Sequence, residues 1–400
     1  MAAKEFQVKG CRLAAASAGI RYSDRRDLCL VELAPGSSVA GVFTRNRFCA
    51  APVTLARQHL AAGEVRYLLI NSGNANAGTG AEGMQAALTC CQLVAKSAGC
   101  DASQVLPFST GVIGEPLPIA PFETSVPQLM QGLVGNAWPD AARAIMTTDT
   151  LPKLTQRQVR WGSKEISLVG MAKGSGMIHP NMATMLGYIV CDARVSRELA
   201  CRWNSELAEI SFNRATVDGD TSTNDACILA FTGGADRETI ESEDDRRAQP
   251  LYQALKSIYL ELAQALVRDG EGATKFVTLR VRGGRSQQEC KQVAFAVAHS
   301  PLVKTAFFAS DPNWGRILAA VGNAGLDDLD TDQVNIDLDQ LALVRHGQRA
   351  AGYSEQAGQE VFNQPEFTVV IDLGRGSEDT EVWTSDLSHQ YVTINAEYRT

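Results

Sequence analysis

Side chains able to carry out acyl transfer gather between residues 171 and 192. Lys173 and His179 lie in a stretch of small and loop-forming residues, and Thr184 immediately precedes a hydrophobic, strand-like run. A threonine in that position can attack the carbonyl group before it, and the cleavage leaves a free α-amine beside the hydroxyl. Because the pKa of such an amine is about 7.7–8.0, it can act as general base for its own hydroxyl. Spacing alone favours a surface lysine, a hydrogen-bonded loop histidine and a strand-edge threonine over this catalytic interpretation.

Two glycine-rich stretches could place backbone N–H groups against a ligand. "INSGNANAGTG" (70–80) follows one strand-like run, and "STGVIG" (109–114) follows another. The first stretch matches neither of the common glycine-rich phosphate motifs. A tight turn in which Asn71, Asn74 and Asn76 bond the backbone is therefore favoured over a phosphate site. Either loop could also supply the oxyanion hole of an acyl-transfer enzyme.

The segment "TVDGDTSTND" (216–225) holds three aspartates within ten residues, which suggests a calcium loop. Counted from Asp218, the EF-hand template requires glycine and glutamate where the chain has Thr223 and Leu229. A hydrogen-bonded cluster of turns is the favoured interpretation, and a pocket-lining role stays open. None of the ten cysteines forms a CxxC pair and no two of the five histidines lie within one helical turn, so we expect no metal site.

The composition is that of a globular protein, since 45% of the 400 residues are hydrophobic and 20% are charged. The formal net charge of −8 argues against nucleic acid or an anionic membrane as the main partner. No apolar run approaches the roughly 18–20 residues that a membrane span requires. The N-terminal stretch 1–21 lacks the apolar segment of a secretory signal, and scattered cysteines are typical of a reducing compartment. The expected location is the cytoplasm.

The elements that must position these loops can be read from apolar periodicity. Helical spacing predicts a helix over 81–98 that ends at Gly99, and another over 251–266 that ends before Gly270. Alternation of strands and helices predicts the α/β or α+β class. A change in pattern near residue 281 predicts the start of a smaller second domain. Strand-like runs cover residues 28–33, 66–70 and 185–191.

Ten blocks of the sequence, in order, resemble the ornithine acetyltransferases. This family is also called the bifunctional glutamate N-acetyltransferase/amino-acid N-acetyltransferases of arginine biosynthesis. The resemblance covers nearly the whole chain, and ten matches in order are too specific to arise by chance. The blocks are "FTRNRFCAAPV" (43–53), "INSGNANAGTG", "STGVIG", "MTTDTLPK" (146–153), "KGSGMIHPNMATML" (173–186), "TVDGDTSTND", "RDGEGATK" (268–275), "SPLVKTA" (300–306), "DPNWGRI" (311–317) and the terminal "YVTINAEYRT".

The resemblance implies roles for individual residues. Members of the family cleave themselves within the "MATML" block, which places the cut here between Ala183 and Thr184. Thr184 would then be the N-terminal nucleophile, and Thr110 and Gly111 would stabilise the oxyanion. The substrate contacts that the resemblance implies are Thr150, Lys173, Thr184, Glu271, Asn395 and Thr400.

The resemblance also implies a fold and an assembly. The expected fold is an α/β (α+β) protein with a layered α-β-β-α sandwich of the DmpA/ornithine acetyltransferase type over about 1–280. A smaller C-terminal α/β domain would follow over about 281–400. Cleavage would give an α chain, 1–183, and a β chain, 184–400, and such chains usually assemble as an α2β2 heterotetramer.

The implied reaction moves an acetyl group from N2-acetyl-L-ornithine to L-glutamate by a ping-pong mechanism. Thr184 would take the acetyl group, ornithine would leave, and the amine of glutamate would attack the acetyl-threonine ester. We expect Lys173 to bind the α-carboxylate of acetylornithine and Glu271 its δ-ammonium group. No cofactor is implied, although acetyl-CoA is a co-substrate in some members of the family. The expected partners are small amino acids and further copies of the cleaved chains.

Three alternatives remain open from the sequence. An amidase or aminopeptidase of the related self-processing fold would use water in place of glutamate as the acceptor. A non-enzymatic amino-acid-binding or regulatory protein would keep the fold without the cut. Calcium or phosphate binding by the aspartate cluster is the most distant alternative.

Overall fold

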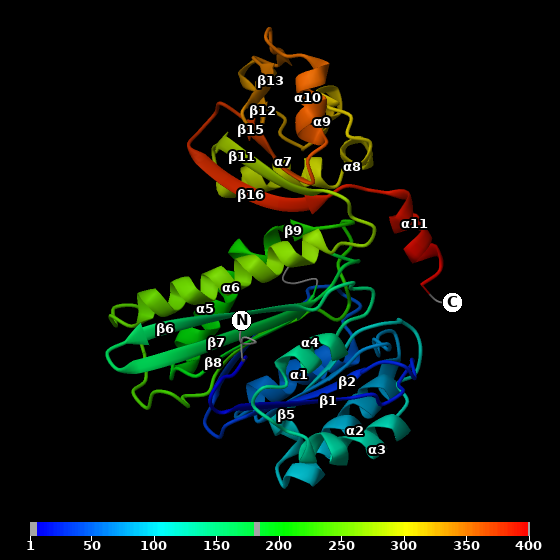
Figure 1. The fold of residues 1–400 in the computed structure, drawn as a ribbon, viewed down its shortest axis with the longest axis vertical. Helices are drawn as coiled ribbons and strands as arrows, with labels where there is room; N and C mark the ends of the chain where they lie inside the picture. The colour runs from blue at the N-terminus through cyan, green and yellow to red at the C-terminus, as the bar shows by residue number, and fades with distance from the viewer. Residues whose placement is uncertain (1–5, 180–184, 399–400) are drawn as a thin grey trace, which may run out of the picture. The chain divides into compact units, whose positions relative to one another are not determined.

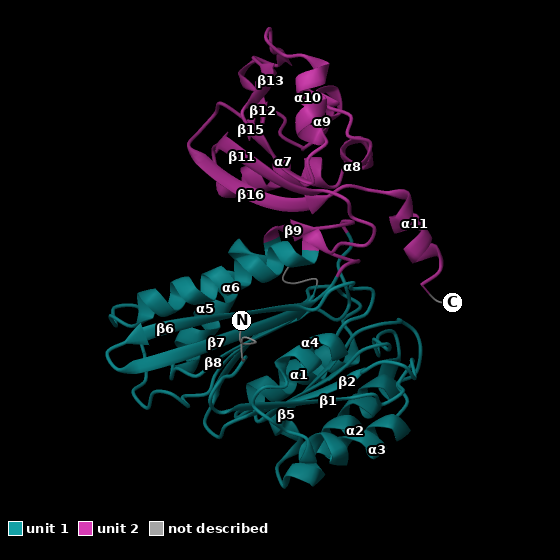
Figure 2. Cartoon of the chain, in the orientation of Figure 1, with its two compact units in different colours: residues 1–174, 179–213, 220–266 teal, residues 175–178, 214–219, 267–400 magenta. Residues whose placement is uncertain are grey.

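The computed structural model describes residues 6–179 and 185–398, which form two compact units (Figures 1 and 2). The predicted domain boundary near residue 281 falls within strand β11 (Phe276–Gly284) of unit 2. The predicted cut after Ala183 lies outside the described residues and stays a prediction. Unit 1 consists of residues 1–174, 179–213 and 220–266, and unit 2 of residues 175–178, 214–219 and 267–400.

Two stacked β-sheets form the centre of unit 1 (Figure 1). The first has the strand order β1-β2-β4-β5 and the second has the order β3-β10-β8-β7-β6. The pairs β4–β5 and β8–β10 are parallel, and the other neighbours are antiparallel. The strands are β1 (Cys11–Ala16), β2 (Leu28–Leu33), β3 (Ser38–Phe43), β4 (Tyr67–Asn71), β5 (Val105–Ser109), β6 (Lys153–Trp161), β7 (Lys164–Lys173), β8 (Leu186–Cys191) and β10 (Ala226–Phe231).

The main core of unit 1 lies between these two sheets, because alternate side chains of each strand point to this side. Leu68 and Ile70 of β4 meet Tyr188 and Val190 of β8 in this core, and all four are almost fully buried. The rings of Phe108 and Tyr188 pack edge to face with centroids 5.3 Å apart, which ties the first sheet to the second.

Helices cover the outer faces of both sheets. α2 and α3 pack on the first sheet in a second core with Leu30 and Leu69, and α6 packs on β7, where Gly170 leaves room for Ile258. Unit 1 is therefore a layered α-β-β-α sandwich, which confirms the predicted fold class. Its helices are α1 (Ala51–Ala62), α2 (Gly80–Ala98), α3 (Ala120–Gln131), α4 (Trp138–Ala144), α5 (Arg197–Ile210) and α6 (Ala248–Arg268).

Unit 2 is built on a seven-stranded sheet with the order β14-β13-β12-β15-β11-β16-β9. Apolar side chains of β11 and β15 form its core with α7, and Phe307, Phe362 and Phe367 pack against one another there. The further elements are β9 (Ala215–Thr216), β12 (Asn335–Leu338), β13 (Leu341–Arg345), β14 (Gln348–Arg349), β15 (Glu366–Asp372), β16 (Glu378–Ser385), α7 (Gln287–Ala298), α8 (Pro301–Phe308), α9 (Trp314–Gly322), α10 (Glu355–Phe362) and α11 (His389–Ala396).

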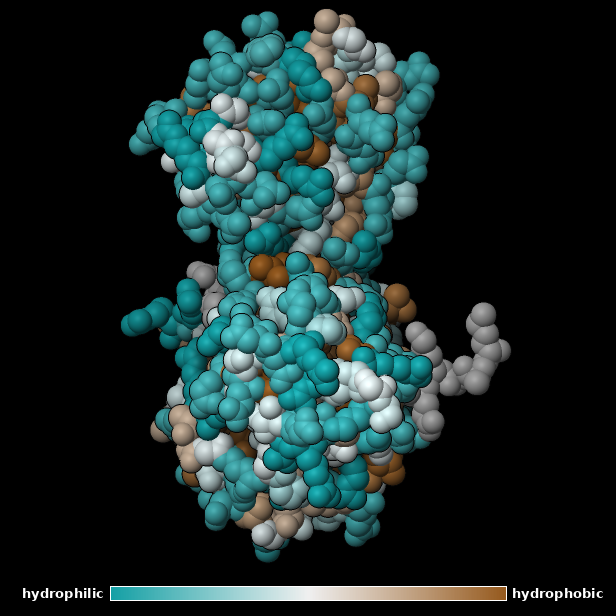
Figure 3. Space-filling view, turned by 90° about the vertical axis from the view of Figure 1, so that its left-hand side faces the viewer, coloured by the Kyte–Doolittle hydropathy of each residue, from teal (hydrophilic) through white to brown (hydrophobic). Residues whose placement is uncertain are grey.

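The strands and helices predicted from periodicity are confirmed as β2, β4, β8, α2 and α6. Gly99 ends α2 in the left-handed conformation (φ 68°), and its N–H donates to the carbonyl oxygen of Ala95. Figure 3 shows a mostly hydrophilic face with scattered apolar residues, as expected when most apolar side chains lie in the cores. Among the residues that the structure describes, no helix has both the length and the apolar character needed to cross a bilayer.

Candidate functional site

The two glycine-rich loops begin at the same edge of the first sheet, because β4 and β5 are parallel neighbours. The loops are joined by backbone hydrogen bonds: Thr110 N donates to Asn71 O (3.0 Å) and Ala75 N donates to Val112 O (2.9 Å). Within the first loop, the side-chain amide of Asn71 donates to the carbonyl oxygen of Asn74 (2.9 Å). The predicted turn, in which asparagines bond the backbone, is confirmed.

Gly111 allows these loops to approach each other closely. Its φ of +133° lies in the region that favours glycine, and a Cβ placed on it would lie 2.3 Å from the carbonyl carbon of Gly73. The same Cβ would lie 2.6 Å from the backbone nitrogen of Asn74. Because both contacts are to backbone, any side chain at this position would push the loops apart.

Substitution Gly111→Ala is therefore expected to displace the two glycine-rich loops from each other. We expect any enzymatic activity that depends on these loops to fall by about 10²-fold, since a displacement of about 1 Å in a site can have an effect of this size. Gly322→Ala is a suitable control, because a Cβ on Gly322 would meet no atom within 4 Å. Steady-state kinetics and thermal melts of both variants test this expectation, and a Gly111→Ala protein with normal kcat would contradict it.

Asn224, in the segment "TVDGDTSTND" (216–225), links the two glycine-rich loops. Its side-chain amide donates to Ala75 O (2.6 Å) and Ser109 O (2.9 Å), and its side-chain oxygen accepts from the hydroxyl of Thr223 (2.6 Å). Asn224 is buried, so the loss of these bonds would leave buried carbonyl groups unpaired. The predicted hydrogen-bonded turn cluster is confirmed here. In the part of the chain that the structure describes, no group of three or more His, Cys, Asp or Glu residues could hold a metal ion.

Lys173 brings a positive charge to this sheet edge in unit 1. It is the last residue of β7, it is buried, and its Nζ donates to the Thr110 hydroxyl oxygen at 3.3 Å. Two residues that the sequence placed in one site are thus in contact in the structure. This contact leaves the Thr110 hydroxyl proton available for donation to another acceptor.

A buried carboxylate, Asp149, lies next to Lys173 and was not predicted. Its Oδ1 accepts from Lys153 Nζ (2.6 Å) and from the backbone N–H of Gly174 (2.7 Å), and its Oδ2 accepts from Thr147 N (3.1 Å). A possible sequence signal is the i,i+4 spacing of an acid and a lysine in "MTTDTLPK", which is common on protein surfaces and therefore weak.

The charges around Asp149 hold it in the ionised form. Burial raises its pKa, but the positive charges of Lys173 and Lys153 and the hydrogen bonds from Gly174 and Lys153 outweigh burial and lower the pKa to about 2. Because the folded pKa is below the ordinary value of 3.8, this carboxylate stabilises the folded state at neutral pH. That contribution is lost as the pH falls from about 4 towards 2.

Two further predicted residues meet in unit 2. Glu271 is buried, its N–H donates to Ser175 O (2.8 Å), and its Oε2 accepts from the side-chain amide of Asn395 (2.7 Å). A Cβ on Gly176 would lie 2.3 Å from the carboxyl carbon of Glu271, so glycine is required for this close approach. The carboxylate of Asp218 accepts from the backbone nitrogens of Met177 (2.6 Å) and Ile178 (2.9 Å) in the same unit.

The remaining predicted site residues are Thr150, Ala183, Thr184 and Thr400. Thr150 is exposed on the loop after Asp149. Ala183, Thr184 and Thr400 lie outside the described residues. The structure thus brings Thr110, Gly111 and Lys173 together in unit 1, and Glu271 and Asn395 together in unit 2.

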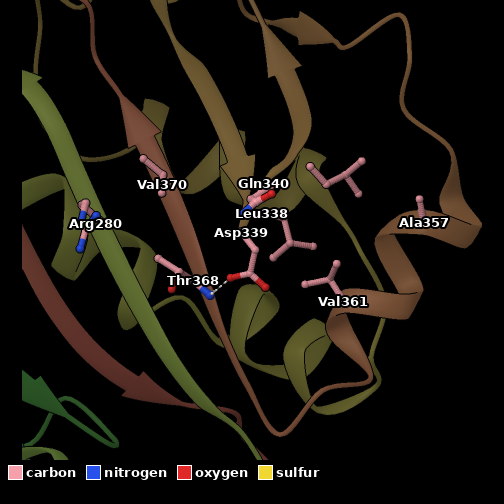
Figure 4. A pocket seen from close by; sticks show the side chains of 9 residues that line it. Arg280, Leu338, Asp339, Gln340, Ala357, Val361, Thr368 and Val370 are labelled. Carbon is pink, nitrogen blue, oxygen red and sulfur yellow. Dashed lines mark hydrogen bonds between the residues drawn. The ribbon is translucent and has the colours of Figure 1, made fainter.

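A cavity of about 840 Å³ in unit 2 contains none of the predicted site residues (Figure 4). Arg280, Thr368 and Val361 are among its lining side chains, and Asp339 accepts a hydrogen bond from the backbone nitrogen of Thr368.

A layered sandwich in which a loop at the strand ends of one sheet presents a threonine hydroxyl to a buried lysine at the end of β7 fits an enzyme of the acyltransferase class. The ArgJ family model matches residues 12–400. The arginine biosynthesis bifunctional proteins ArgJ of Psychrobacter arcticus and Pseudomonas fluorescens are 52% and 53% identical to this chain, over 98% of it and 97% of each relative. The chain belongs to the ArgJ family and is an acetyltransferase of arginine biosynthesis, which confirms the predicted family and enzyme class.

A solved relative supports the fold. The crystal structure of the arginine biosynthesis bifunctional protein ArgJ from Bacillus halodurans has a chain that is 33% identical to this one, with a TM-score of 0.51. The match covers 99% of that chain and 53% of this one.

Proposed function

We propose that this protein transfers the acetyl group of N2-acetyl-L-ornithine to L-glutamate, with Thr184 as an N-terminal nucleophile that forms after cleavage of the Ala183–Thr184 bond. Acetyl-Thr184 is the intermediate: the hydroxyl oxygen forms an ester with the acetyl carbon, and the amide bond to ornithine breaks as its nitrogen gains a proton. The amine of glutamate then attacks this ester and restores the threonine hydroxyl. No cofactor takes part, and acetyl-CoA would enter as a second acetyl donor.

The contact between Lys173 and Thr110 is the observation that carries the proposal. Donation by Lys173 Nζ at 3.3 Å leaves the Thr110 proton free for a developing oxyanion. The Gly111 backbone N–H is the second donor that we assign to the oxyanion hole. Such donors contribute on the order of 3–4 kcal/mol each to transition-state stabilisation.

The proposed cleavage has a separate line of support. The Bacillus halodurans chain is matched over 99% of its own length but spans only 53% of this chain. Residues 184–400 make up 217 of 400 residues, about 54%, which is close to that share. A chain of this length is what cleavage before Thr184 would produce.

Incubation of the purified protein with acetylornithine, with and without glutamate, tests the reaction. We expect N-acetylglutamate to form only with glutamate present, and little free acetate without it. Rapid release of acetate in the absence of glutamate would instead identify an amidase. Replacement of acetylornithine by acetyl-CoA in the same assay shows whether the thioester is also a donor.

Glu271 is proposed to bind the δ-ammonium group of acetylornithine, since it is a buried carboxylate held by Asn395. Glu271→Gln is expected to raise the KM for acetylornithine by about 10- to 100-fold, because a charged hydrogen bond contributes about 1.5–3 kcal/mol. The control compares inhibition by ornithine with inhibition by 2-aminopentanoic acid, which lacks the δ-ammonium group. The preference for ornithine should vanish in the variant, and its persistence would contradict the assignment.

The assembly and the location of the protein are also proposals. We propose that the cleaved chains form an α2β2 heterotetramer in the cytoplasm. Mass measurement of the native complex, followed by separation of its chains under denaturing conditions, tests the assembly.

A further inference from the structure

We propose that Asp149 is a positioning residue that fixes the Lys173 ammonium group beside Thr110 and keeps it positively charged during turnover. The catalytic meaning of this inference rests on the proposed function. Its structural basis is a cluster of three buried charges in unit 1, one carboxylate and the two lysines 153 and 173.

Asp149 is placed by three different parts of the chain. Thr147 N–H on its own loop, Lys153 Nζ at the start of β6 and Gly174 N–H directly after β7 all donate to its carboxylate, at distances of 2.6–3.1 Å. The bond to Gly174 fixes the backbone of the residue that follows Lys173. The carboxylate therefore acts on Lys173 both through its charge and through the position of the strand end.

The carboxylate of Asp149 supplies negative charge to a cluster that holds two buried lysines. Lys153 and Lys173 are 4% and 8% exposed, so both ammonium groups are largely removed from water. Burial and a like-charged neighbour each disfavour the protonated form of a lysine. The negative charge of Asp149 interacts favourably with the positive charges of both lysines.

Substitution Asp149→Asn keeps the shape of the side chain but leaves two buried ammonium groups without this counter-charge. We expect Lys173 to lose its proton at lower pH, so that the KM for acetylornithine rises at least tenfold between pH 7 and pH 9. The parent enzyme should change by less than about twofold over this range. A merely structural role for Asp149 would lower the amount of folded protein without changing this pH profile.

A second measurement does not depend on activity. Cyanate modifies neutral amines, so the pH at which Lys173 becomes half-reactive, read by mass spectrometry of its peptide, reports its proton. We expect this midpoint to fall by at least one pH unit in Asp149→Asn. If the parent protein transfers no acetyl group, the proposed function fails, but this experiment still tests the inference.

Two further variants guard against misfolding and non-specific effects. The double variant Asp149→Asn with Lys153→Met removes both partners of the buried pair, a change that is often tolerated, and its midpoint should lie between those of the parent and the single variant. Asp236→Asn removes another buried carboxylate that binds a lysine of β7, Lys164 (2.6 Å), and should leave Lys173 unaffected. An unchanged Lys173 midpoint in both Asp149 variants would overturn the inference.

Discussion

Thr184→Ala is expected to give a single chain near 43.0 kDa that does not transfer acetyl groups. The parent protein should instead run as two chains under denaturing conditions, the second beginning with Thr184. The variant loses the hydroxyl that attacks the preceding carbonyl and also the nucleophile of the transfer reaction. Loss of a catalytic nucleophile lowers kcat by a factor on the order of 10⁴ or more. Intact mass, N-terminal sequencing and the glutamate-dependent assay measure these effects.

Thr184→Ser is the matched control, because it keeps a hydroxyl at the same position. It should still cleave and should retain measurable transfer. An intact parent chain that exchanged acetyl groups between ornithine and glutamate would contradict the proposed chemistry, as would an active Thr184→Ala protein.

Thr110→Val should produce the second largest loss, a decrease in kcat of about 10²- to 10³-fold, because it removes one donor of the proposed oxyanion hole. Valine has nearly the shape of threonine, so the loop and the cleavage of the chain can be compared directly with the parent. The KM for acetylornithine should change much less than kcat, since the donor acts on charge that develops in the transition state.

Two controls accompany this variant. Thr110→Ser keeps the hydroxyl and should keep most of kcat, whereas Thr124→Val removes a hydroxyl that only bonds the backbone of α3 (Thr124 Oγ1 to Ala120 O, 3.2 Å). If Thr110→Val retained kcat within a factor of about three, the oxyanion would have to be stabilised elsewhere.

The sequence predicted those elements whose signal is local. Apolar periodicity and Gly99 were sufficient for α2, and a continuous apolar run was sufficient for β8. The sheet of unit 2 could not be predicted, because its order depends on pairings between distant segments. Its edge strand β9 is only Ala215–Thr216 and pairs with β16 from far along the chain. Two residues carry no periodicity.

The site was predicted in part for a similar reason. Family resemblance identified Thr110 and Lys173, and the structure places them in contact. The hydrogen bonds from Asn224 to both loops could not be predicted, because a side-chain amide that bonds two distant carbonyl groups leaves no pattern in the sequence. Asp149 was missed because burial, which gives it its importance, is a property of the packed structure.

The strand order of the second sheet in unit 1 bears on what a broken backbone would do. Strands from both sides of residue 184 form it: β3 from before this residue pairs with β10 from after it, and β7 from before pairs with β8 from after. The two pieces would remain joined by the hydrogen bonds of these two strand pairs and would separate only when the whole sheet unfolds. Neither piece contains all five strands of this sheet, so refolding from separated pieces should be poor, and maturation would be irreversible in practice.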